Sequence, residues 1–269
     1  MSGTARFALV AALLLISATA LGDAATDTQA LAKQAQNPIA NLISVPVQSN
    51  TNFGVGPTNG VQEVLYLQPV IPFTISGDWN LITRWIVPLI NQPKLAFGGQ
   101  GDTFGMGDIN PSFFLSHVGH NMVWGAGPTF LLPTASDHVL GSGQWGAGPT
   151  AVILVTPGKW VMGALANNIW SFASDGEQRP PVDQMLIQPF VNYNLSQGWY
   201  LTSSPIITSN WRAVPHDRWT VPLGAGFGRL VRLGKIAVNS YVQAFGYAAS
   251  PDGGPDWSLR LQVQVLLPK

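Results

Sequence analysis

The sequence contains no cysteine among its 269 residues, and it is poor in charged side chains. The first absence excludes a disulfide framework and thiolate chemistry. Charged residues make up 10% of the chain, against about 25% in ordinary soluble domains. A soluble surface built from so few charges would be unusually bare. The formal net charge is zero, which gives no sign of a nucleic-acid partner.

Long apolar runs are also missing after the N-terminus, so no later spanning helix is expected. Residues 1–25 have the layout of a secretory signal peptide, with Arg6, an apolar stretch over 7–18 and an Ala-x-Ala cleavage motif ending at Ala20. A second candidate cleavage site ends at Ala24 or Ala25. Residues 26–40 favour a short helix that Pro38 ends. This segment could lie in the periplasm, fold into a lumen, or fray without a role.

Glycine (29 residues) and proline (21 residues) are plentiful, which favours many short elements joined by turns. From residue 41 onward, twelve apolar or alternating runs are separated by turn residues. The run 257–269 is the clearest: odd positions from Trp257 to Leu267 are apolar, and even positions from Ser258 to Gln264 are polar. Such alternation gives a strand one apolar and one polar face. A half-buried strand of a soluble sandwich would show the same pattern.

The connections between the runs alternate in length. Short turns occur at 77–78, 119–121, 157–159, 196–198 and 233–235, and longer segments at 51–60, 96–103, 137–144, 175–183, 213–218 and 250–256. Short turns at one end and longer loops at the other are typical of outer-membrane barrels. We therefore predict an all-β fold, a transmembrane antiparallel β-barrel of about 12 strands over residues 41–269, with both barrel termini on the periplasmic side.

Tryptophans gather near the ends of the runs, where two interfacial belts would stabilise amphipathic rings. Tryptophan in β-proteins also occurs in cores, but a core position would favour the middle of a run. The predicted belts comprise Trp79, Trp160 and Trp199 at the short turns, and Trp145, Trp170, Trp211, Trp219 and Trp257 at the longer loops.

The minority face of several runs is rich in amides and hydroxyls, which suit a water-filled lumen better than a soluble core. The predicted lumen-lining residues are Arg84, Asp108, Asn110, Gln188, Asn192, Arg260, Gln262 and Gln264. So few charges predict no strong ion selectivity. A barrel of this size would have a narrow lumen, which the N-terminal segment or a loop could obstruct.

Prolines lie inside many of the runs, where they remove a donor from the sheet. We expect bulges or kinks there, often beside glycine, as at Gly127-Pro128 and Gly148-Pro149. The sequence from Trp124 to Thr129 recurs from Trp145 to Thr150, which suggests growth by hairpin duplication.

Six stretches carry a family resemblance: 31–44 (LAKQAQNPIANLIS), 68–73 (QPVIPF), 107–111 (GDINP), 125–129 (GAGPT), 188–194 (QPFVNYN) and 253–257 (GGPDW). Through them the chain resembles bacterial outer-membrane proteins labelled as transporters of the phenol-degradation meta-pathway type, often mislabelled "neuromedin U". The resemblance implies a β-barrel and uptake of small or hydrophobic molecules, and it implies no catalytic residue. Many outer-membrane barrels end in an aromatic residue that the insertion machinery recognises, whereas this chain ends in Leu267-Pro268-Lys269.

Catalytic and metal-binding patterns are weak. His117 and His120 flank a tight turn without other ligands nearby, and Asp252 and Asp256 fit a plain turn better than a cation site. The stretch 224–228 is rich in glycine, but no helix follows it. The nominal nucleophile and base candidates are Ser116 with His117, or a loop serine with His138 or His216. No motif supports them, so we predict no enzyme, catalytic residue, cofactor or metal.

The predicted function is passive uptake of small neutral or weakly hydrophobic solutes through the bacterial outer membrane. The expected partners are the lipid bilayer, an unknown solute and, during assembly, the insertion machinery. The alternatives are an outer-membrane hydrolase, a structural barrel, and a soluble secreted all-β binding protein.

Overall fold

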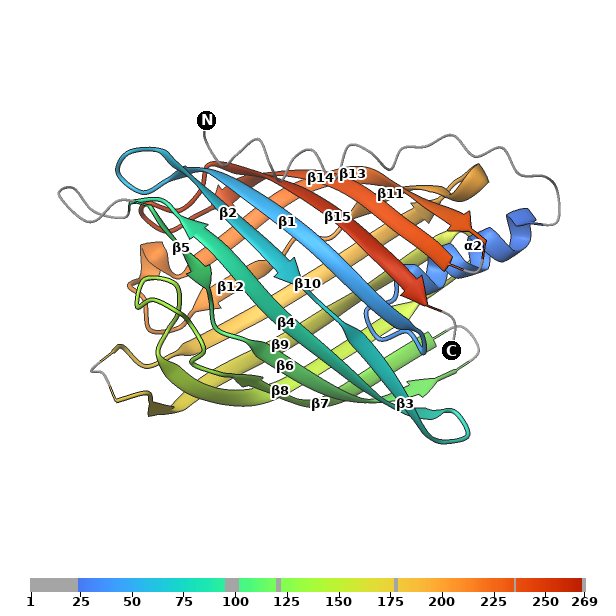
Figure 1. The fold of residues 1–269 in the computed structure, drawn as a ribbon, viewed down its shortest axis with the longest axis horizontal. Helices are drawn as coiled ribbons and strands as arrows, with labels where there is room; N and C mark the ends of the chain where they lie inside the picture. Colours follow the sequence, from blue (N-terminus) through green and yellow to red (C-terminus); the bar gives the residue numbers. More distant parts are fainter. Residues whose placement is uncertain (1–23, 95–101, 120–121, 177–178, 235, 268–269) are drawn as a thin grey trace.

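A computed structural model describes residues 24–94, 102–119, 122–176, 179–234 and 236–267. Residues 1–23, which hold most of the predicted signal peptide, lie outside this range, as does His120. The fold is a ring of tilted strands with one helix at one end (Figure 1). No helix among the described residues is long and apolar enough to cross a lipid bilayer.

Three of the segments that cross the barrel wall are interrupted once each, so fifteen strands form a barrel of twelve. The interrupted segments are β2 with β3, β5 with β6, and β11 with β12. The elements are α2 (Ala24–Ala35), β1 (Ile43–Val55), β2 (Gly60–Leu67), β3 (Val70–Ser76), β4 (Trp79–Gln92), β5 (Thr103–Met106), β6 (Asn110–Val118), β7 (Met122–Leu131), β8 (Gln144–Val155), β9 (Trp160–Ser174), β10 (Asp183–Asn194), η1 (Ser196–Gly198), β11 (Trp199–Ser203), β12 (Ile207–Asn210), η2 (Pro215–Asp217), β13 (Trp219–Leu233), β14 (Ile236–Ala249) and β15 (Trp257–Leu267).

The barrel closes between its first and last strands. β1 pairs with β15 in antiparallel register from Ile43 opposite Leu267 to Phe53 opposite Trp257. At the last of these pairs the two aromatic rings stack, with their centroids 4.0 Å apart. Closure leaves the sheet without a free edge, as a spanning sheet requires in lipid. The prediction of a closed barrel of about twelve strands is confirmed.

The connections largely follow the predicted alternation, with one exception at residues 51–60. β1 continues to Val55 and β2 begins at Gly60, so the connection is a four-residue turn over 56–59. Asn59 takes a positive φ of 50° in this turn, a conformation that asparagine tolerates well. The prediction of a long loop here was wrong, because a polar strand end resembles a loop in sequence. Most of the predicted loop 96–103 lies outside the described residues.

The internal prolines rarely produce the bulges that we expected. Pro222 adjoins a register shift, and Pro69 and Pro205 lie in the interruptions between β2 and β3 and between β11 and β12. Pro128 and Pro149 pair directly with each other, so the two copies of the repeated sequence form one hairpin, β7–β8. Proline removes one donor from a strand without forcing an extra residue into it, and its neighbours keep their register.

The helix α2 lies at the short-turn end of the barrel, where η1 also lies (Figure 1). The predicted short N-terminal helix is confirmed, and it ends at Ala35, shortly before Pro38. Residues 36–42 continue from it to β1, and Ile39 on this segment is 1% exposed within an apolar cluster. The core of the protein therefore lies inside the ring.

Candidate functional site

Polar side chains occupy the buried face of the strands around the middle of the barrel. On β15, Ser258, Arg260 and Gln264 are buried and alternate with less buried apolar residues. On the neighbouring β14, Asn239 pairs with Gln264, and Gln243 pairs with Arg260. Because side chains on a strand alternate between its faces, these residues project into the ring while their neighbours project outward.

Hydrogen bonds join these inward amides and hydroxyls across the wall. The Tyr200 hydroxyl donates to Asn239 Oδ1 over 2.7 Å, and Asn239 Nδ2 donates to Gln264 Oε1 over 3.1 Å. Gln243 Nε2 donates to Thr202 Oγ1 over 3.0 Å. Buried amides are stable when partnered in this way, so this part of the wall holds its polar side chains in fixed positions.

A cavity of about 120 Å³ lies in the ring beside this network, large enough for several water molecules. Of the predicted lumen residues, the cavity is lined by Arg84, Gln188, Asn192, Gln262 and Gln264. Its wall also includes Gln48, Tyr200 and Tyr241, which project inward from β1, β11 and β14, and Gln68, which lies in the interruption between β2 and β3.

The N-terminal segment borders this cavity. Ala35, Gln36, Asn37 and Pro38 all line it. Gln36 and Asn194 of β10 exchange hydrogen bonds between their side-chain amides, over 2.9 and 3.1 Å. Residues 35–38 therefore obstruct the ring at the short-turn end, which is one of the three positions that the sequence allowed for this segment.

An apolar cluster lies next to the obstruction. Ile39 packs in it with side chains from six strands, which make the inside of the barrel apolar at this level. The buried members are Ile39, Val70, Ile82, Phe114, Val152, Leu154, Val161, Leu165 and Phe190. Three of them, Val70, Leu165 and Phe190, also line the cavity, so its wall is polar on one part and apolar on another.

Two arginines stand among the polar residues. Arg260 is 5% exposed; its Nη1 donates to the Ser204 carbonyl over 2.7 Å, and its Nε donates to Asn50 Oδ1 over 3.2 Å. Its guanidinium also lies 4.7 Å from the centroid of the Phe245 ring. Arg84 Nη2 donates to Gln68 Oε1 over 2.7 Å. Neither arginine forms an ion pair within the described part of the chain.

Asp108 and Asn110, two of the predicted lumen residues, do not line this cavity, and they contact β7 and the loop that follows it. Asp108 accepts hydrogen bonds from the backbone of Ala135 and from the backbone and hydroxyl of Ser142. Asn110 donates to Thr129 Oγ1 over 3.0 Å. The Asp108 carboxylate thus holds the loop between β7 and β8, where a larger cavity of about 600 Å³ opens beside Ser142 and Arg179.

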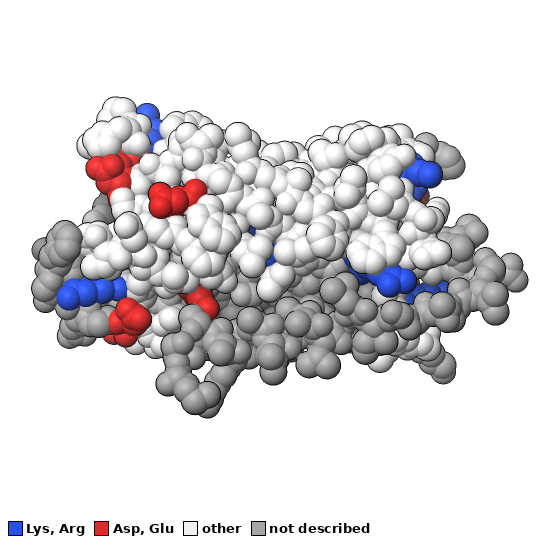
Figure 2. Space-filling view, turned by 90° about the horizontal axis from the view of Figure 1, so that it is seen from above, with Lys and Arg blue, Asp and Glu red and all other residues white. Residues whose placement is uncertain are grey.

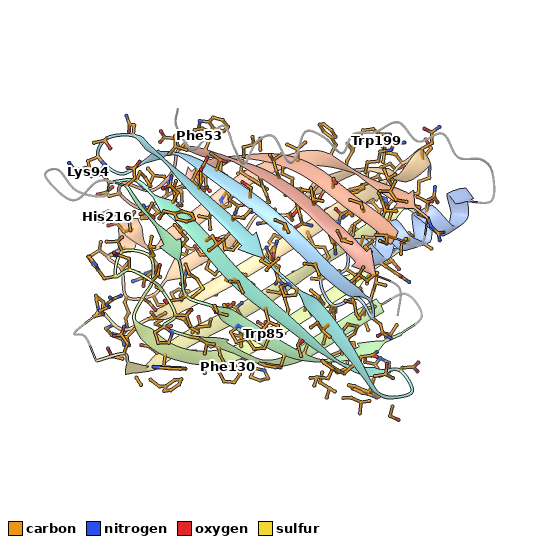
Figure 3. All side chains as sticks on the ribbon, in the orientation of Figure 1. Phe53, Trp85, Lys94, Phe130, Trp199 and His216 are labelled. Carbon is orange, nitrogen blue, oxygen red and sulfur yellow. The ribbon has the colours of Figure 1, made fainter. Side chains whose placement is uncertain are left out.

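The outer face of the barrel carries large apolar side chains. Of the tryptophans assigned to belts, all but Trp199 are at least 36% exposed. At one end Trp211 packs edge-on against Trp219, and at the other Arg229 lies 5.1 Å from the ring of the half-buried Trp199. Figure 3 shows Trp199 and His216 at opposite ends of the molecule.

Charged side chains also favour the two ends. Figure 2 shows acidic groups gathered at one end and a broad, mostly uncharged surface between the ends. At the acidic end His216 and Asp217 approach to 3.5 Å, and His216 and Asp252 to 4.0 Å. These three groups, of which Asp217 is half-buried, could hold a metal ion, and Asp256, which the sequence placed with Asp252 in a plain turn, is not part of the group.

The nominal catalytic pairs are not assembled. Ser116 and His117 are consecutive on β6, so their side chains point to opposite faces of the wall. The Ser116 hydroxyl is buried inside the barrel, and His117 stacks outside against Trp79 and Trp124. His138 approaches Asp137, and His216 approaches Asp217 and Asp252, so the groups found beside these histidines are aspartates.

Sequence analysis missed several residues of this site, among them Gln48, Gln68, Tyr200 and Tyr241. The signal was present, because β1 carries Gln48, Asn50 and Asn52 at alternate positions. In β14, Asn239, Tyr241 and Gln243 follow the same rule. The aromatic ring of a tyrosine resembles an outward belt residue in sequence, and this hides its inward position.

Comparisons with known proteins agree with the fold. No protein-family model matches the chain, and no curated protein matches it. The crystal structure of the COG4313 outer membrane channel from Pseudomonas putida F1 is similar, with a TM-score of 0.65 and 16% identity over 84% of this chain and 94% of that one. The NanC porin has a TM-score of 0.51 and 9% identity, over 84% of this chain and 100% of that one.

Proposed function

We propose that this protein is a narrow outer-membrane channel through which small neutral or weakly hydrophobic solutes cross passively. The observation that carries the proposal is the cavity inside a closed barrel, whose wall combines amides such as Gln262 with apolar side chains such as Phe190. A closed barrel with an apolar outer face is suited to lipid. The similarity of the fold to outer-membrane channels supports the same function.

The exposed tryptophans support a location in the bacterial outer membrane. On this proposal the tryptophans at the two ends form the interfacial belts, and the mostly uncharged surface between them faces the hydrocarbon layer (Figure 2). The short-turn end with α2 then faces the periplasm. Residues 1–25 act as the export signal, 26–40 as the N-terminal helical segment and 41–269 as the barrel. The insertion machinery of the outer membrane would assemble it.

The family of phenol-degradation meta-pathway transporters is the assignment that we favour within this class. Three of the stretches in which this chain resembles the family contain features that shape the interior of the barrel. Residues 31–44 include the obstructing segment, 68–73 begin at the interruption between β2 and β3, and 107–111 cover the interruption between β5 and β6.

Conductance of the refolded protein in a planar lipid bilayer tests the proposal. Discrete current steps would support both the barrel and a continuous path through it. Silence from protein that is shown to be inserted would contradict the open channel, and would favour a structural barrel or an enzyme. Protein that stays in the aqueous phase without detergent would contradict the membrane location.

A further inference from the structure

The interior of the barrel carries positive charge that no acidic side chain of the described residues pairs with. Arg84 and Arg260 both project into it, and no ion pair reaches either of them from the described residues. Asp108, the acidic side chain predicted for the lumen, is occupied by the backbone and hydroxyl of the β7–β8 loop. A desolvated cation without a counter-ion attracts an anion, because charge is costly to bury unpaired.

Arg260 is fixed by the protein itself. Its guanidinium donates to Asn50, Ser204 and Gln243, and it stacks over an aromatic ring. These bonds use its Nε and Nη1, the side chain is 5% exposed, and Arg260 is not among the residues that line the cavity. Arg260 therefore contributes its charge to the interior but offers little direct contact to a solute.

Arg84 is arranged differently. It makes one hydrogen bond to the protein, to Gln68 Oε1, and it lines the cavity. A guanidinium has five N–H donors, and none of the unpaired nitrogens of Arg84 is fully buried. The Gln68 amide nitrogen is likewise unpaired and not fully buried. Donors from both side chains therefore remain available to a molecule in the cavity.

The neighbours of Arg84 are apolar on one side. Val70 is its direct partner across the β3–β4 ladder, and Val70 lines the same cavity together with Leu165 and Phe190. Tyr241, which also lines the cavity, lies within electrostatic range of both arginines. The guanidinium of Arg84 thus lies in a cavity whose wall is partly apolar.

We propose that Arg84 and Gln68 form a binding subsite for the carboxylate of a small solute whose apolar body lies against Val70, Leu165 and Phe190. The planar guanidinium matches a carboxylate in geometry and charge. The inference rests on the proposed channel function and deepens it, since it adds a preferred class, small monocarboxylates, to the neutral solutes that the pore also admits.

Single-channel recording in potassium chloride tests the subsite with three molecules of one shape: butyrate, butyramide and butylammonium. Each is added on the long-loop side, and the chloride current is measured as its concentration rises. We expect butyrate to block the current at concentrations where the neutral and cationic analogues do not. We also expect the wild-type current to favour chloride over potassium.

The Arg84→Gln variant keeps a polar side chain with N–H donors, although a shorter one, and it loses the charge. It should raise the half-blocking concentration of butyrate about tenfold or more, the ratio expected for one lost charge-assisted hydrogen bond, and it should lower the chloride preference. Arg84→Lys keeps the charge without the planar guanidinium. Its half-blocking concentration of butyrate should lie between those of wild type and Arg84→Gln. Arg212→Gln removes a charge from an exposed position in the loop after β12, and it should match wild type.

Equal block by butyrate and butyramide, or unchanged block in Arg84→Gln, would overturn the subsite while a measurable current upheld the channel. Absence of current from inserted protein would overturn the channel alone. Butyrate binding to the detergent-solubilised protein, followed by saturation-transfer NMR, then decides the subsite: loss of the signal in Arg84→Gln supports it, and no signal in wild type overturns it.

Discussion

At the scale of single residues, two arginines with the same charge have different surroundings. Arg260 donates to several acceptors of the wall, whereas Arg84 makes one hydrogen bond and faces the cavity. Deleting a donor leaves buried acceptors unpaired, and each costs free energy. The stability of the barrel should therefore respond to Arg260, and the selectivity of the proposed channel to Arg84.

Arg260→Leu should lower the free energy of unfolding by about 2–4 kcal/mol, because Asn50, Ser204 and Gln243 lose a shared donor. Urea unfolding in lipid vesicles, followed by tryptophan fluorescence, measures it. Arg212→Leu, at an exposed loop position, provides the control and should change stability by less than about 0.5 kcal/mol. Equal loss in the two variants would show that the Arg260 contacts contribute little.

At the scale of elements, the N-terminal segment decides how far the ring is open. Ile39 anchors it in the apolar cluster, and Gln36 ties it to Asn194 of β10. On the helix itself, Lys33 Nζ donates to the Gly158 carbonyl of a short turn over 2.6 Å. Three contacts with different chemistry thus hold one short segment at the end of the barrel.

Ile39→Asp should release this segment, because an unpaired carboxylate in an apolar cluster costs several kcal/mol. The expected result is a larger single-channel conductance, with the barrel otherwise folded. Gln34→Asp adds the same charge at an exposed position of α2 and should leave the conductance at the wild-type value. A conductance that does not change in Ile39→Asp would mean that the segment does not limit the current.

Some strands could be predicted from the sequence more accurately than others. The predicted run 257–269 gave β15 its correct start at Trp257, because one of its faces is apolar throughout; the described strand extends to Leu267, and residues 268–269 lie outside the described range. The interruption at Pro69 was not foreseen, since proline alone does not say whether a strand bulges, breaks or continues. β7 and β8 run through Pro128 and Pro149 without a break, and these two prolines pair with each other.

The site was harder to predict than the fold. The polar positions of single strands were visible, and Arg84 and Arg260 were both assigned to the lumen from alternation alone. Their different partners depend on the register across β1 and β2, which join β15 to β4. No local pattern encodes that register, so the unbalanced charge and the free donors of Arg84 appear only when the ring is closed.

At the scale of the whole molecule, the closed ring of hydrogen bonds accounts for the resistance that we expect towards detergent. Removing β15 would leave β1 and β14 as unpaired edges, which promote aggregation. The full chain, kept unheated in dodecyl sulfate, should migrate differently from the heated sample on a gel. A chain truncated after residue 256 should show no such difference, and a heat-dependent shift in the truncated chain would mean that the β1–β15 pairing is dispensable.

The placement of α2 has a consequence for assembly. The helix is joined by the chain to β1, yet its apolar residues Ala32 and Ala35 pack with Leu230, Ala237 and Leu266, which belong to β13, β14 and β15. It therefore bridges the two sides of the seam. Once the helix has docked, β1 is held near β15 before these two strands pair. The effective concentration of one strand near the other then no longer depends on the length of chain between them. The N-terminal segment that lies against the cavity therefore also holds the two sides of the barrel seam together.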